Sequence, residues 1–89
     1  MNETINRIFE SWRESYFSKD AKAAIEAAHG PEVLAAVMAI YDCLIDLGQG
    51  PQSMDESLGA VSLTMSRDYP WLSQEARGRL LHAFVMTWK

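Results

Sequence analysis

The sequence predicts an all-α fold: a small single-domain bundle of four to five helices around a buried central helix. Apolar residues fill 48% of the 89 positions and recur at the helical spacing of three and four, and no segment alternates with the period of two of a strand. Charged residues make up only 22%, a balance that favours a packed core over disorder. A chain this short supports one core, because it buries only about two thirds of its unfolded surface. We therefore expect residues 1–89 to form one domain.

The first predicted helix runs along residues 5–16, where apolar side chains recur every three or four positions between charged ones. This spacing is typical of an amphipathic helix that packs one face on a core. The sequence is compatible both with a break before the next helix and with one continuous helix. Its apolar positions are Ile5, Ile8, Phe9, Trp12 and Tyr16.

A short alanine-rich helix is expected next, over residues 21–29. Ser18 or Asp20 can cap its start, because their side-chain oxygens accept hydrogen bonds from the first free backbone amides of a helix. Gly30 can adopt the left-handed conformation that ends a helix, and Pro31 suits the first turn of the following one.

Residues 32–47 are predicted to form the central helix, covered by the other helices on most sides. Nearly every position is apolar, and only Asp42 and Asp46 interrupt the run with charges. The two carboxylates lie one turn apart on a narrow stripe of small and polar residues. Cys43, in the same run, is expected to be a small buried residue.

Two further helices are expected after a loop at residues 48–51, which holds two glycines and a proline. Ser53 and Glu56 match a capping box at the start of the fourth helix, which should end near Arg67. After an aromatic turn, Ser73 is expected to cap the fifth helix. The expected inner positions are Leu58, Val61, Ser62 and Met65 in the fourth helix and Leu80, Leu81, Phe84, Val85 and Trp88 in the fifth.

The chain is expected to work in the cytoplasm, with no membrane span. Its first ten residues lack the cationic stretch and apolar run of a secretory signal. The longest unbroken apolar run, 33–41, has nine residues, whereas a transmembrane helix needs roughly 20. A single cysteine cannot form an intramolecular disulfide and suits a reducing compartment.

Candidate catalytic groups are few, so we expect no enzyme activity, no metal and no cofactor. Two histidines and one cysteine show no metal-ligating spacing such as HxxxH or CxxC. His29 adjoins a helix end, where an imidazolium favours the negative end of the helix dipole. Asp42 and Asp46 could serve acid–base catalysis if burial raised a pKa; a solvated helix edge, or contact with a basic partner residue, is the simpler interpretation.

The aromatic residues are the most informative feature for function. Eight of the nine lie near the two chain ends or in the turn that holds Tyr69 and Trp71, and Tyr41 stands alone in the middle. In one interpretation the first and last helices bury them against each other over the central helix. In the other, so small a bundle leaves an aromatic patch for a second copy or another protein, with Trp12 and Trp71 as exposed anchors.

Charge is distributed unevenly along the chain. Residues 1–46 carry eight acids and four bases, a net charge of −4, whereas residues 47–89 carry four of each. The acidic half could face a basic partner, an asymmetry that speeds association and selects orientation more than it raises affinity. Because the whole chain is acidic, nucleic acid and anionic membranes repel it on average, and neither is expected as a partner.

The sequence therefore predicts a small acidic cytoplasmic protein-interaction module, an inhibitor, adaptor or regulator that binds another protein or a second copy of itself. The alternative is a helix-turn-helix-like DNA-binding transcriptional regulator that uses Arg77, Arg79 and Lys89 on phosphates. The candidate partner-binding residues are Trp12, Tyr16, Asp42, Asp46, Tyr69, Trp71, Arg79 and His82.

Overall fold

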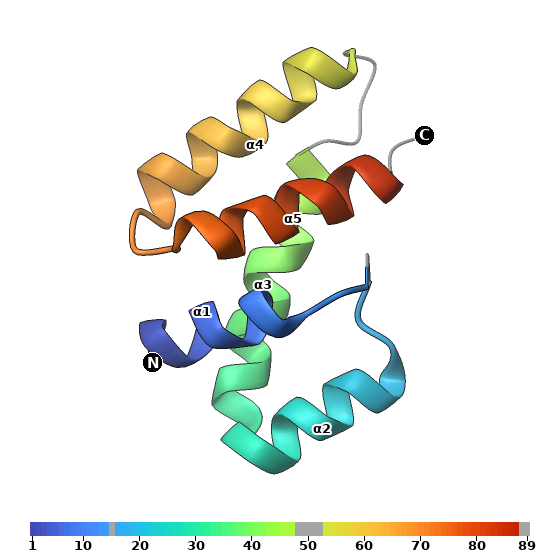
Figure 1. The fold of residues 1–89 in the computed structure, drawn as a ribbon, viewed down its shortest axis with the longest axis vertical. Coiled ribbons are helices and arrows are strands. Elements are labelled where there is room, and N and C mark those ends of the chain that lie inside the picture. Colours follow the sequence, from blue (N-terminus) through green and yellow to red (C-terminus); the bar gives the residue numbers. More distant parts are fainter. Residues whose placement is uncertain (15, 48–52, 88–89) are drawn as a thin grey trace.

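The computed structural model describes residues 1–14, 16–47 and 53–87, which form five helices and no strand (Figure 1). The predicted all-α fold class is confirmed. Within these described ranges, no helix has the length and apolar character needed to cross a membrane. The helices are α1 (Asn2–Ser11), α2 (Lys19–His29), α3 (Pro31–Leu47), α4 (Met54–Asp68) and α5 (Gln74–Thr87).

Helix α3 is the central helix, because each of the other four packs against it. Figure 1 shows α2 at its first end, α4 toward its last end, and α5 crossing in front of it. Its inner face buries Val37 and Leu44. Its outer stripe is exposed and includes Cys43, so the expectation that Cys43 is buried is wrong. The Cys43 thiol lies at the edge of α3 and interacts with the Tyr69 side chain instead of packing in the core.

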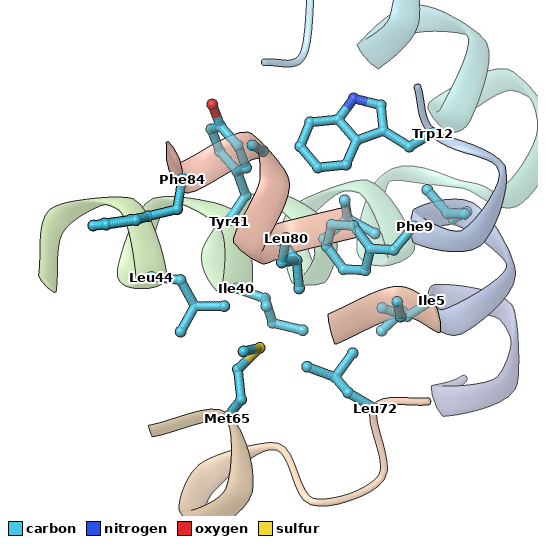
Figure 2. Packing of buried hydrophobic residues seen from close by; sticks show 14 of the residues in the cluster. Ile5, Phe9, Trp12, Ile40, Tyr41, Leu44, Met65, Leu72, Leu80 and Phe84 are labelled. Carbon is cyan, nitrogen blue, oxygen red and sulfur yellow. The ribbon is translucent and has the colours of Figure 1, made fainter. Parts of the chain in front are cut away.

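The hydrophobic core joins α1, α3, α4 and α5 (Figure 2). Helices α1 and α5 pack against each other and both contact α3, as one of the two interpretations of the aromatic residues predicts. Fully burying one such apolar side chain contributes about 1.5–3 kcal/mol. The largest fully enclosed apolar side chains are Ile5, Phe9, Val37, Leu44, Val61, Met65 and Phe84.

The inner faces of the last two helices agree only in part with the sequence pattern. Val61, Met65, Leu80 and Phe84 are buried as expected. In contrast, Ser62 and Val85 are exposed, so these two expectations are wrong. Instead, four small residues of α4 and α5 are buried, and small side chains allow helices to pack closely. These buried small residues are Ser57 and Thr64 in α4 and Ala76 and Ala83 in α5.

Helix caps form where the sequence places them. The Ser18 hydroxyl oxygen accepts a hydrogen bond from the backbone N–H of Ala21 at 3.1 Å, and that of Ser53 accepts from Glu56 at 3.2 Å. Gly30 ends α2 with φ of +95°, a conformation that residues with a side chain rarely adopt. The predicted loop at 48–51, together with Trp88 and Lys89, lies outside the described residues.

Polar contacts join α1 to the turn that precedes α5. The Asn6 side-chain amide donates to the carbonyl of Trp71 at 3.0 Å, and its oxygen accepts from the backbone N–H of Ser73 at 2.9 Å. The Ser73 hydroxyl donates to a Glu10 carboxylate oxygen at 2.5 Å and accepts from the N–H of Ala76 at 3.1 Å. One serine therefore caps α5 and binds α1 to it.

Helix α1 ends at Ser11, not at residue 16, so the predicted first helix is too long. The backbone of Trp12 is extended, with φ of −75° and ψ of 130°. The Arg13 guanidinium donates to the carbonyl of Glu10 at 2.5 Å, one of the last acceptors that a helix end leaves free. A connecting segment, residues 12–14 and 16–18 as described, therefore separates α1 from α2.

Candidate functional site

Four aromatic rings pack together where the connecting segment meets α1 and α3. Trp12 and Phe17 stack with ring centroids 4.5 Å apart and planes 5° from parallel. Tyr41 meets both rings nearly edge-on at 5.6 and 5.3 Å, and Phe9 does so at 5.9 and 6.1 Å. Such pairs contribute about 0.5–1.5 kcal/mol each beyond burial. Figure 2 shows Phe9, Trp12 and Tyr41 within the core, so this aromatic cluster anchors the connecting segment.

Trp12 is a member of this cluster and is only 8% exposed, so the expectation of an exposed Trp12 is wrong. The extended backbone at Trp12 turns its indole inward, and the indole N–H donates to the carbonyl of Tyr16 at 3.2 Å. The Tyr16 side chain points outward and is 56% exposed. Of these two candidate residues, only Tyr16 is therefore an exposed side chain.

A pocket of about 280 Å³ opens between α1, the connecting segment and α2. Trp12 and Phe17 line it from the aromatic cluster, and Ile8 and Ser11 line it from α1. The Ser11 hydroxyl donates to the carbonyl of Ile8 at 3.2 Å. Helix α2 contributes the remaining lining residues, which are Ala21, Ala24, Ile25, Ala28 and His29.

The pocket results from the short side chains of α2. None of the eleven residues of this helix, all of which the structure describes, is buried. Its five pocket-lining positions follow the spacing of one helix face; three of them are alanine, and only Ile25 and His29 carry larger side chains. Because α2 packs mainly on α3, alanine leaves the space toward α1 unfilled. The alanines are visible in the sequence, but by themselves they indicate only a high propensity to form a helix.

The size and lining of the pocket suit one apolar group. Its 280 Å³ lies between an engineered cavity of about 150 Å³ that binds benzene and the lower limit of about 300 Å³ for drug-sized ligands. Seven of the nine lining residues are apolar, the exceptions being Ser11 and His29. A single large side chain, or a small molecule of similar size, would therefore fill it.

Tyr69 and Trp71 form a second, separate aromatic pair. Their ring centroids lie 6.2 Å apart at 82°, and both side chains are half-buried against the core. The expectation that Trp71 is an exposed anchor is therefore wrong, because the turn that carries it is bound to α1. Burial raises the pKa of Tyr69, and its hydrogen bond with Cys43 and the negative charge of Asp68 add to this effect.

The other candidate residues do not join the pocket. Asp42 and Asp46 are exposed on the outer stripe of α3, whereas His82 is exposed and Arg79 half-buried on α5. Asp42 contributes to the raised pKa of Tyr41, of which burial is the larger cause. In the part of the chain that the structure describes, no three His, Cys, Asp or Glu side chains gather where they could hold a metal.

Arg77, a candidate phosphate contact in the DNA-binding alternative, is hydrogen bonded to the turn before α5. Its guanidinium donates to the carbonyls of Leu72 at 3.0 Å and Pro70 at 2.9 Å, and to the Ser66 hydroxyl at 3.2 Å. These three contacts join α5 to the turn before it and to α4, and they engage three of the five N–H donors of the guanidinium. The observed role of Arg77 therefore gives the DNA-binding alternative no support.

Comparisons with protein-family models, with curated proteins and with solved structures found no match for this chain.

Proposed function

We propose that this protein is a small interaction module, an inhibitor, adaptor or regulator that acts by binding another protein. In this proposal the pocket beside α2 receives one apolar side chain of the partner. The observation that carries it is the pocket: an apolar space of about 280 Å³, open at the surface and lined by the stacked rings of Trp12 and Phe17.

Filling this pocket would supply a large part of the binding free energy. Removing a Leu or Phe side chain of the partner from water stabilises a complex by about 1.5–3 kcal/mol. Residues that dominate interfaces are typically bulky anchors inserted into such pockets. The lining is held in place before binding, because the Trp12 ring is packed on three others and its indole N–H is hydrogen bonded. Little ordering cost therefore opposes the insertion.

In this proposal Tyr16 supplies a second contact with the partner. Its side chain is 56% exposed, and it belongs to the same connecting segment as Trp12 and Phe17. Tyrosine is common at the centre of interfaces, because it offers a large contact area with few rotatable bonds. The proposal places this contact in the cytoplasm and includes no catalysis. A second copy of the chain is the other partner that the same surface could accept.

A capture experiment with two matched variants tests the proposal. The pocket-filled variant (A24L/A28L) places leucine at two pocket positions, and the control variant (A23L/A27L) places it at two exposed positions of α2 outside the pocket lining. Leucine and alanine have similar helix propensities, so α2 forms in both variants. Tagged wild type and both variants are incubated with lysate before and after nuclease treatment, and the retained proteins are quantified by mass spectrometry.

We expect a protein that wild type and the control variant retain equally and that the pocket-filled variant loses by about tenfold or more. Equal retention by all three chains would contradict the pocket as the contact site. Retention of DNA before nuclease treatment, with no protein after it, would instead favour the DNA-binding alternative.

A further inference from the structure

Helix α2 is attached to the rest of the molecule by little buried apolar surface. None of its eleven residues, all of which the structure describes, is buried. Of its apolar side chains, only Ala21 and Ile25 pack partly against the core. Because alanine is small, Ile25 is the one large apolar side chain that docks this helix. The apolar burial that holds α2 in place is therefore much smaller than that of α5, which buries Leu80 and Phe84.

Polar contacts add nothing to this attachment. Within the described ranges, no ion pair or side-chain hydrogen bond joins α2 to another helix. The Ser18 hydroxyl accepts from the N–H of Ala21, which caps α2 without binding it to a neighbour. The turn before α5 differs, because the side chains of Asn6 and Ser73 bind it to α1. Helix α2 therefore depends on its small apolar contact with α3.

Both ends of α2 adjoin parts of the chain that are fixed in the core. Phe17, two residues before the helix, is buried in the aromatic cluster, and Pro31 after it begins the central helix α3. A helix held at both ends cannot swing away as a rigid rod, so it leaves α3 only by unwinding. Helices shorter than about 12–15 residues are marginal in water without tertiary packing. Undocking and unfolding of α2 are therefore one step.

The pocket exists only while α2 is folded. Five of its nine lining residues come from α2. On the opposite side, Trp12 and Phe17 are held by ring packing in the aromatic cluster. One wall of the pocket is thus fixed, and the other can open. A group that fills the pocket contacts both walls and is bound only in the closed form, so by mass action it favours the folded helix.

We propose that α2 opens as a separate unit: it unfolds transiently while α1, α3, α4 and α5 stay packed, and filling the pocket holds it closed. Local openings of this kind occur where few buried contacts hold a segment, and they cost less free energy than global unfolding. The opening belongs to the free chain and does not depend on what the pocket binds. Under the proposed function, insertion of a partner's side chain would also suppress it.

Hydrogen exchange of the full chain under native conditions, followed by NMR, tests this proposal. The backbone amides of Ile25 and Glu26 report on α2, and neither residue is replaced in the pocket-filled or the control variant. The amides of Val37 in α3 and Phe84 in α5 report on the core. Each exchange rate is divided by that of an unstructured peptide of the same sequence, in wild type and in both variants, with and without low urea.

In wild type the two α2 amides should exchange about 100-fold or more faster than the two core amides. Low urea should change the α2 rates little, because opening eleven residues exposes little surface. The pocket-filled variant should slow α2 exchange about tenfold, because its leucines bury apolar area only in the closed form. The control variant, whose leucines are exposed, should change this rate by less than about threefold.

Two results would overturn the proposal. Equal protection of the α2 and core amides would mean that α2 unfolds only together with the core. Fast α2 exchange that the pocket-filled variant slows no more than the control variant does would mean that filling the pocket does not hold the helix closed. The proposed function fails by a different result, unchanged retention of the cellular partner by the pocket-filled variant.

Discussion

Helices α5 and α2 show two different uses of a short amphipathic helix in one chain. Helix α5 buries Leu80 and Phe84 almost completely and packs against α1, α3 and α4. Helix α2 has a similar length, yet none of its described residues is buried, and it borders an open pocket. The difference follows from side-chain size, because alanine occupies most of the inner face of α2. An open pocket is left where the packing is incomplete.

The largest difference in stability between the two helices is expected when one side chain in each is truncated to alanine. Phe84→Ala removes a ring that is 1% exposed and should lower the free energy of unfolding by about 3–5 kcal/mol. Ile25→Ala on α2 removes a half-buried side chain and should cost only about 1 kcal/mol. Urea unfolding followed by circular dichroism measures both. Similar losses would mean that α2 is as integral to the core as α5.

Asn6→Ala should cause the next largest loss of unfolding free energy. It removes both hydrogen bonds that join α1 to the turn before α5, and it leaves the Ser73 N–H without this acceptor. Leaving a partly buried group without its partner costs about 1–3 kcal/mol. The matched control is Asn2→Ala, an exposed position of the same helix, which should change stability by less than about 0.5 kcal/mol. The same urea titration distinguishes the two variants.

The pocket-filled variant tests whether small side chains cause the difference between α2 and α5, because it adds side-chain volume to α2. We expect its free energy of unfolding to equal or exceed that of wild type by up to about 1 kcal/mol, since apolar area is buried without loss of a contact. The control variant adds the same leucines outside the pocket and should show no gain. A loss of more than about 1 kcal/mol in the pocket-filled variant would indicate an overpacked site rather than an open one.

The aromatic cluster is expected to have a smaller effect, a loss of stability at high pH. Burial and the negative charge of Asp42 raise the pKa of Tyr41. The folded state therefore keeps its proton at a pH where the unfolded state releases it, so stability falls as the pH rises above about 10. Tyr69, whose pKa is also raised, contributes to the same fall. Tyr41→Phe should reduce the slope of unfolding free energy against pH between 9 and 11; an unchanged slope would contradict this assignment.

Local signals in the sequence predicted the fold well. Ser18, Ser53 and Ser73 cap helices at the expected places, because a cap depends on hydrogen bonds to residues only a few positions away. Tertiary contacts decided the end of α1. The helical spacing continues to residue 16, but the indole of Trp12 is buried against Phe17 and Tyr41 only if the chain leaves the helix after Ser11.

The candidate site could be predicted only in part. The aromatic residues near the amino terminus belong to the region that holds the pocket, yet Trp12 lines the pocket from within the core while Tyr16 is exposed. The alanines of α2 were visible as a helix-forming run. Their consequence, an unfilled volume, depends on the distance between α1 and α2, which no local pattern specifies.

Photocrosslinking from two exposed positions tests whether a partner binds at the pocket between α1 and α2. Tyr16 and Leu63 are 56% and 65% exposed, but Leu63 lies on α4, which contributes no residue to the pocket. Each is replaced in turn by p-benzoylphenylalanine, and the protein is irradiated in the source cells. A crosslinked partner is expected from position 16 and not from position 63. A partner captured from position 63 alone would contradict the pocket between α1 and α2 as the binding site.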